Sequence, residues 1–123
     1  MKYTVLAASA MLAMSSASYA GFTNHTQVNI SGNTAYGSFI GARQAADSTQ
    51  YIYCASVAFT TSAPYVICGA RTAAGVSRSC ISTDPGHMEA VRGLSNESYV
   101  YMRWNDTGHC DYIYTSTGSM YHQ

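Results

Sequence analysis

Four cysteines constrain the fold of this 123-residue chain more than any other feature of its sequence. They are Cys54, Cys68, Cys80 and Cys110. An even number of cysteines in a small exported chain indicates disulfides rather than free thiols. Each disulfide contributes about 2–4 kcal/mol, which is a large part of the net stability of a small domain. We therefore expect two disulfides.

The first 20 residues predict export. Lys2 is followed by a short apolar run, and small residues that end at Ala20 precede Gly21. This order is typical of a signal peptide, and the run is shorter than the roughly 20 apolar residues of a membrane-spanning helix. We expect residues 1–20 to be cleaved off, with no membrane insertion afterwards. Residues 21–123 then form a single domain, which is extracellular, or periplasmic if the source is bacterial.

Runs of β-branched and aromatic residues between turn-forming residues predict an all-β fold. One or two short strands are expected in 21–41, and further strands at 50–59, 65–71, 76–82, 98–104 and 110–116. One short helix is predicted over 84–93, because Asp84 can cap it, Pro85 suits its first turn and Gly93 suits its end. About five to seven short strands indicate a small antiparallel β-sandwich or flattened barrel, with the helix as a crossover.

The turns decide which cysteines can face each other. Cys54 and Cys68 are symmetric about the loop that joins their strands, and Cys68 and Cys80 are equally symmetric about the next turn. Cys68 can bond only once, and four cysteines allow three pairings. We favour Cys54–Cys68 with Cys80–Cys110, because the second disulfide would tie the middle hairpin to the last one.

The charge of the mature chain argues against two classes of partner. Once Lys2 leaves with the signal peptide, five arginines face six acidic residues, a net charge of about −1. The mature sequence has no run of basic residues that could bind phosphates, so neither nucleic acid nor an anionic membrane is an expected partner.

Residues 104–112, WNDTGHCDY, look like a chemical site, but we interpret them as a hairpin tip. His109 and Cys110 are adjacent on a predicted strand and would point to opposite faces, and an exported cysteine is expected to be oxidised. His109 and Asp111 share a face, yet they supply only two of the three or four ligands that zinc requires. No metal and no cofactor is expected.

A hydrolase is the alternative that the sequence leaves open. His87, Glu89 and His109, together with Arg92, could form a ribonuclease-like acid–base site if the fold brought them into one pocket. No Gly-x-Ser-x-Gly motif or phosphate-binding glycine loop accompanies them.

The last hairpin carries the strongest functional signal, an alternation of tyrosines with apolar residues. Tyr99, Tyr101 and Arg103 on one strand, and Tyr112 and Tyr114 on the other, are expected on the outer face. The residues between them, Val100, Met102, Trp104 and Ile113, are expected to face the core.

The expected register of this hairpin contains a conflict. Pairing Trp104 with His109 places Tyr101 opposite Tyr112 and Tyr99 opposite Tyr114, but it also puts Cys110 on the tyrosine face. Either the disulfide of Cys110 lies on the surface, or a bulge at Gly108 shifts the register.

The tyrosines have two interpretations. They could be ordinary strand residues that cover a small sheet. They could also form a recognition face, because a tyrosine offers a rigid ring and one polar group. We expect a secreted, non-enzymatic recognition or structural module that uses these tyrosines and Arg103. Its partner would be a glycan or a protein surface, possibly another copy of the chain in an extracellular assembly.

Overall fold

The computed structural model describes residues 21–122. The predicted signal peptide falls on residues 1–20 and lies outside the described residues. No helix among the described residues is long and apolar enough to cross a membrane.

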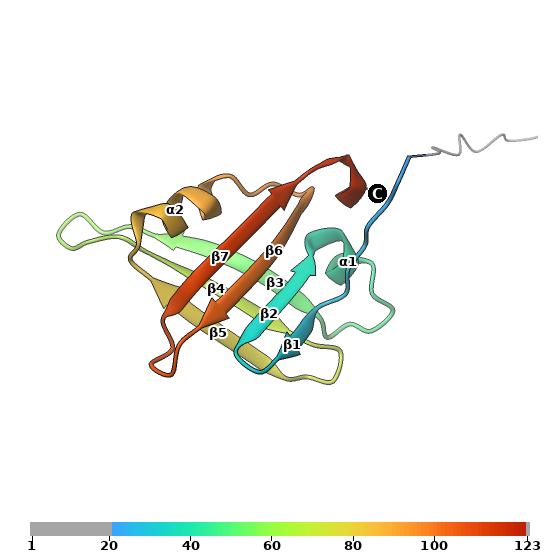
Figure 1. Ribbon diagram of the computed structural model, residues 1–123, viewed down its shortest axis with the longest axis horizontal. Coiled ribbons are helices and arrows are strands. Elements are labelled where there is room, and N and C mark those ends of the chain that lie inside the picture. Colours follow the sequence, from blue (N-terminus) through green and yellow to red (C-terminus); the bar gives the residue numbers. More distant parts are fainter. Residues whose placement is uncertain (1–20, 123) are drawn as a thin grey trace, which may run out of the picture.

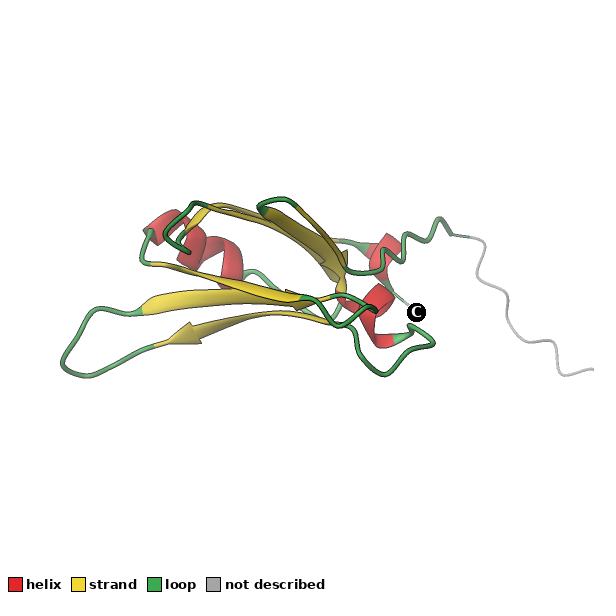
Figure 2. Cartoon of the chain, turned by 90° about the horizontal axis from the view of Figure 1, so that it is seen from below, coloured by secondary structure: helices red, strands yellow, loops and turns green. Residues whose placement is uncertain are grey.

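Within residues 21–122, seven strands form two antiparallel sheets that stack on each other (Figures 1 and 2). The four-stranded sheet has the order β1-β2-β6-β7, with β1 (Asn29–Ser31), β2 (Thr34–Ser38), β6 (Ser98–Trp104) and β7 (Cys110–Thr117). The three-stranded sheet has the order β3-β4-β5, with β3 (Tyr51–Val57), β4 (Tyr65–Arg71) and β5 (Ser77–Ser82). The predicted all-β fold is confirmed as a sandwich, and the sheets do not close into a barrel.

The predicted helix is present as α2 (Pro85–Arg92). The Asp84 side chain caps it by accepting hydrogen bonds from the backbone N–H groups of Gly86 and His87. The structure adds two short elements that the sequence did not predict, α1 (Phe39–Arg43) and the 3₁₀ turn η1 (Ser119–Tyr121). The one or two short strands predicted in 21–41 are β1 and β2, and Phe39 and Ile40 begin α1 directly after β2.

The core lies between the two sheets. Met102 and Val100 of the four-stranded sheet and Val66 of the three-stranded sheet are almost completely buried there. Val91 of α2 is also part of this core, and Met88 packs against it. The predicted core face of the last hairpin is confirmed, since Val100, Met102, Trp104 and Ile113 all belong to this cluster or pack on it.

The two disulfides pair as predicted, Cys54–Cys68 and Cys80–Cys110, and no cysteine is free. The first joins directly opposed residues of the neighbouring strands β3 and β4. The second joins β5 to β7 and so connects the two sheets. Next to it, the N–H of Ile81 donates a hydrogen bond of 3.2 Å to the carbonyl of Gly108. Two disulfides in so small a domain fit an oxidising environment.

The predicted register of the last hairpin is wrong by two shifts. The first lies at the turn, where Asn105 rather than Trp104 pairs with His109, and Gly108 takes a left-handed conformation (φ 81°). Trp104 therefore faces Cys110, which places the cysteine on the core side. Of the two alternatives that the sequence allowed, a surface disulfide or a bulge at Gly108, the structure has the bulge.

The second shift returns the tyrosines to the outer face. Trp104 faces Cys110 but Arg103 faces Tyr112, so Asp111 is an extra residue in β7. Tyr101 then lies opposite Tyr114, not opposite Tyr112, and Tyr99 lies opposite Ser116. The conflict in the sequence is resolved because Cys110 is 7% exposed while Tyr112 and Tyr114 are 42% and 47% exposed.

Candidate functional site

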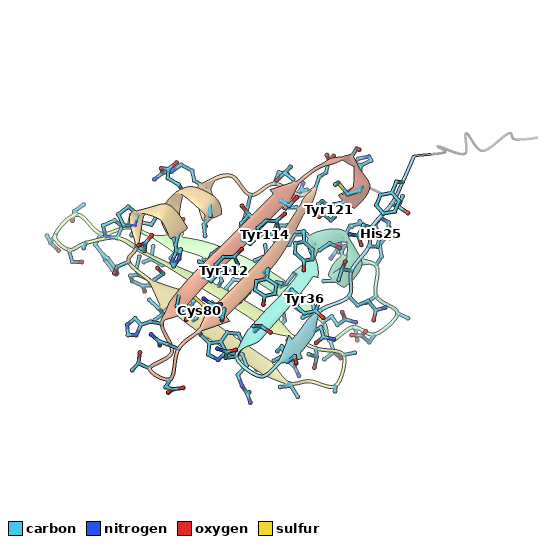
Figure 3. All side chains as sticks on the ribbon, in the orientation of Figure 1. His25, Tyr36, Cys80, Tyr112, Tyr114 and Tyr121 are labelled. Atoms are coloured by element: carbon cyan, nitrogen blue, oxygen red, sulfur yellow. A yellow bond between two sulfur atoms is a disulfide. The ribbon has the colours of Figure 1, made fainter. Side chains whose placement is uncertain are left out.

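The candidate site is the outer face of the four-stranded sheet, which we call the tyrosine face (Figure 3). Antiparallel pairing brings β2, β6 and β7 side by side, and every second residue of each strand points away from the core. The tyrosine face consists of Tyr36, Tyr99, Tyr101, Tyr112 and Tyr114, with Arg103 at one end and Tyr121 at the other.

The rings of the tyrosine face form one continuous set of contacts. Tyr36 stacks on Tyr101 with ring centroids 5.9 Å apart, and Tyr99 stacks on Tyr121 at the same distance. Tyr112 meets Tyr101 edge to face at 5.7 Å, and Tyr114 meets Tyr99 edge to face at 6.2 Å. These centroid distances and orientations are the ones aromatic pairs prefer. The tyrosine rings of the edge strand β7 are thus roughly perpendicular to the β6 rings that they contact.

A shallow depression of about 390 Å³ lies within this face. It is lined by the five residues that the sequence singled out, Tyr99, Tyr101, Arg103, Tyr112 and Tyr114. The structure therefore brings together all of the predicted site residues.

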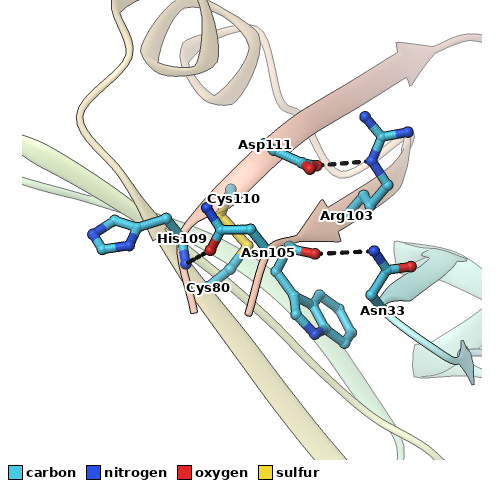
Figure 4. Close-up of polar contacts among 8 residues, drawn as sticks. Asn33, Cys80, Arg103, Asn105, His109, Cys110 and Asp111 are labelled. Carbon is cyan, nitrogen blue, oxygen red and sulfur yellow. Dashed lines mark hydrogen bonds and ion pairs between the residues drawn. A yellow bond between two sulfur atoms is a disulfide. The ribbon is translucent and has the colours of Figure 1, made fainter. Parts of the chain in front are cut away.

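An ion pair borders the depression. Nε of Arg103 donates to Oδ1 of Asp111 at 2.8 Å (Figure 4), and the guanidinium carbon lies 5.4 Å from the centroid of the Tyr112 ring. The hydrogen bond that Arg103 donates to Asp111, and the charge of that carboxylate, raise the pKa of Arg103 above its usual value. Arg103 is thus a permanent cation beside an aromatic face, with a carboxylate next to it.

Tyr99 lies at the centre of the ring contacts. It touches Tyr36, Tyr114 and Tyr121, and it is half-buried, in contrast to the exposed Tyr112 and Tyr114. Burial raises the pKa of its hydroxyl, and the neighbouring tyrosines raise it further. Tyr99 therefore keeps its proton and its role as a hydrogen-bond donor to a higher pH than a free tyrosine does.

Sequence reasoning missed Tyr36 and Tyr121. Tyr36 joins the face because β2 pairs with β6, more than 60 residues away in the chain, and Tyr121 joins it through the turn η1 after β7. Tyr121 is only 6% exposed, so it supports Tyr99 from one side and offers little surface of its own. A local alternation pattern contains no signal for such a pairing.

His87, His109 and Glu89, the residues of the hydrolase alternative, each contact a different partner. Nδ1 of His87 lies 2.6 Å from Oγ of Ser82, and Nδ1 of His109 lies 2.9 Å from Oγ1 of Thr107. Glu89 is paired with Arg92 on the exposed surface of α2. No hydrogen bond within residues 21–122 links any two of His87, Glu89 and His109. The Ser82–His87 pair resembles a nucleophile with its base, but Ser82 is only 3% exposed, so a substrate has little access to it.

A metal site does not emerge from the described part of the chain. In residues 21–122, no three His, Cys, Asp or Glu side chains are grouped so that they could hold an ion. His109 and Asp111, the pair considered from the sequence, are instead bonded to Thr107 and Arg103.

No protein-family model, curated protein or solved structure matches this chain. What the tyrosine face can do follows from its own chemistry. Tyr112 and Tyr114 offer exposed rings, Arg103 offers donors and Asp111 offers acceptors, all on one sheet. This combination suits binding by stacking and hydrogen bonding.

Proposed function

We propose that the protein is an exported, non-enzymatic recognition module that binds a glycan on its tyrosine face. The observation that carries the proposal is the open depression where the half-exposed Tyr112 and Tyr114 stand beside the Arg103–Asp111 ion pair. Export is supported by the signal-like residues 1–20 and by the two disulfides.

A sugar ring requires two kinds of contact, and the depression offers both. The C–H groups on one side of a sugar ring pack against the electron-rich face of an aromatic ring. The hydroxyls around the ring need donors and acceptors, which Arg103, Asp111 and the tyrosine hydroxyls supply. A mostly aromatic lining with a few polar groups that fix orientation is the general form of a small-ligand site.

A protein partner fits the same face less well. A stable protein interface takes about 20–30 residues from each side, whereas the depression is lined by five. Tyrosine-rich surfaces do bind proteins, so self-association or protein binding is the outcome that would replace the glycan.

The test is a glycan array with the purified exported protein, followed by calorimetry on each glycan that binds. Tyr112→Ala and Tyr114→Ala should each weaken binding by about tenfold or more, as truncation of a central aromatic contact does. The matched control is Tyr53→Ala, because Tyr53 is a tyrosine of similar exposure (39%) on the outer face of the other sheet. This variant should bind like the unmodified protein.

Two results would contradict the proposal. One is glycan binding that survives both substitutions on the tyrosine face. The other is a protein that binds no glycan but self-associates in light scattering, with the association lost in Tyr112→Ala.

A further inference from the structure

The two sheets have four edge strands, and three of these are protected against pairing with another chain. β1 has only three residues. β7 carries the bulged, charged Asp111, and its Thr115 hydroxyl is bonded to the Ala90 carbonyl of α2. β5 is tied to β7 by the Cys80–Cys110 disulfide and the Ile81–Gly108 hydrogen bond. Short strands, bulges, charges and cover are the usual ways in which proteins protect a sheet edge.

The fourth edge strand, β3, is neither short nor bulged nor charged, although α1 and α2 lie against parts of it. Its seven residues, YIYCASV, contain no charge and no proline. Most of them favour extended structure. β3 forms the outer edge of its sheet, with α2 near one end and α1 near the other (Figure 1). A strand of this length and composition is a template for pairing.

The register identifies the backbone groups that face outward. The Cα atoms of Cys54 and Cys68 lie 4.0 Å apart, the close spacing of a pair that exchanges no backbone hydrogen bonds. The N–H and C=O of Cys54 therefore point away from β4, and so do those of Ile52 and Ser56, two residues to either side. In residues 21–122, no backbone hydrogen bond from a loop or cap reaches these three residues.

A groove runs beside this free edge. Its volume is about 670 Å³, and it is lined by Phe39, Ile40 and Ala42 of α1, by Tyr51, Ile52, Tyr53 and Cys54 of β3, and by Gln50 and Asn96. The groove also contains Arg43 at the end of α1. Arg43 is exposed and makes no ion pair with any residue of the described chain. The groove thus combines unpaired backbone groups, an apolar floor and one free cation.

We propose that β3 binds an extended peptide as a fourth strand of its sheet. The peptide backbone pairs with Ile52, Cys54 and Ser56, and its residues opposite Ile52 and Cys54 point their side chains into the groove. Those positions, two apart in the peptide, take apolar residues. A carboxylate, from an acidic residue or the peptide's C-terminus, pairs with Arg43.

A flexible peptide fits this site better than a second copy of the chain. If two copies paired through β3, the inward side chain of Ile52 would already be buried in its own core (8% exposed) and could not fill the groove of the other copy. Two copies of Arg43 would also meet no acidic residue on β3, which has none. The peptide proposal is independent of the tyrosine face, which lies on the other sheet.

The probe is a set of four peptides, Thr-Φ-Thr-Φ-Thr-Asp, in which both Φ residues are Val, Ile, Leu or Phe. At least one should bind the unmodified protein, and in NMR the amides of Ile52, Cys54 and Ser56 should shift and become protected from exchange. The same peptide with both Φ residues N-methylated keeps its side chains but loses the donors that face β3. It should bind about tenfold more weakly or not at all.

Protein variants test the same contacts from the other side. Ser56→Pro removes one outward N–H at an exposed position of the edge, and it should abolish binding while the protein still melts cooperatively. Arg43→Glu should weaken binding of the Asp peptide about threefold and improve binding of a peptide with Lys in place of Asp. Arg78→Glu is the matched control, because Arg78 is an exposed arginine on the far edge strand β5.

Three outcomes would overturn the proposal. The first is that none of the four peptides binds at millimolar concentration. The second is that the N-methylated peptide binds as tightly as the unmethylated one. The third is that the protein forms a dimer through β3 that excludes the peptide. The N-methylated arm uses the unmodified protein, so the test stands even if Ser56→Pro does not fold. Tyr112→Ala should leave peptide binding unchanged, which separates this site from the proposed glycan site.

Discussion

The two faces of the β6–β7 hairpin differ in what their side chains contact. On the inner face, Val100 and Met102 have no exposed surface and pack against the opposite sheet. On the outer face, Tyr112 and Tyr114 keep nearly half of their surface exposed, and their rings contact other tyrosines of the same sheet. Neighbouring positions of one strand therefore have different roles. The inner residues hold the two sheets together, and the outer residues are available for binding.

The largest expected effect comes from the inner face. Met102→Ala leaves a cavity between the sheets, because Met102 is among the largest fully buried side chains. It should lower the free energy of unfolding by about 2–5 kcal/mol, which in a domain of this size lowers Tm by more than about 8 °C. Calorimetry measures both. Arg103→Ala, one residue further along β6 but on the outer face, is the control and should melt almost like the unmodified protein. Equal losses in the two variants would remove the distinction between the faces.

A smaller effect is expected within the outer face, between its centre and its border. Tyr101 stacks on Tyr36 and also meets Tyr112 edge to face, whereas Tyr112 lies on the edge strand and is 42% exposed. Tyr101→Ala should cost about 1–2 kcal/mol, since aromatic pairs are each worth about 0.5–1.5 kcal/mol. Tyr112→Ala should cost less than about 1 kcal/mol. Urea unfolding checks both values. A loss of about 3–5 kcal/mol in either variant would mean that the tyrosines are core residues.

The smallest effect is a pH dependence of the free energy of unfolding, and it arises from Tyr99 on the outer face. The pKa of Tyr99 is raised in the folded protein, so above about pH 10 the unfolded chain loses this proton first. The free energy of unfolding should therefore fall as the pH rises beyond about 10. At neutral pH this loss of stability is absent, because both the folded and the unfolded state hold the proton. Urea unfolding at about pH 9 and about pH 11 measures the fall. The fall should be smaller in Tyr99→Phe, with Tyr53→Phe as the control, and an unchanged fall in Tyr99→Phe would contradict the assignment.

Local patterns predicted much of this fold. The strands of the last hairpin alternate with a period of two, Asp84 and Pro85 mark the start of α2, and the turn before Val76 ends at a glycine with positive φ (Gly75, 86°). Each of these features depends on residues within a few positions of one another. The symmetry of Cys54 and Cys68 about their loop is local in the same sense. Because Cys68 and Cys80 are equally symmetric about the next turn, the correct pairing also depended on the expectation that a disulfide ties the middle hairpin to the last one.

The remaining features depend on contacts between distant residues. The extra residue Asp111 is needed because Cys110 must reach Cys80 in the other sheet, and no local pattern contains that requirement. Tyr36 reaches the tyrosine face only through the pairing of β2 with β6. The sequence also predicts that β3 is a strand without showing that it is an edge strand, so the groove beside it could not be foreseen. The five-residue helix α1 is too short to show a helical period.

The extra residue at Asp111 also makes the hairpin adaptable to protein engineering. It separates the segment that carries the disulfide from the segment that carries the tyrosines, so each has its own alternation of inward and outward positions. Outward positions 99, 101, 112 and 114 can then be randomised in a library while Cys110 and the inward residues stay unchanged. Selection from such a library would yield binders to new targets on a disulfide-bonded scaffold. Deletion of Asp111 would remove the bulge and leave a regular alternation, with Cys110 inward and Tyr112 and Tyr114 outward, whereas insertion of one further residue after Asp111 would turn these tyrosines toward the core.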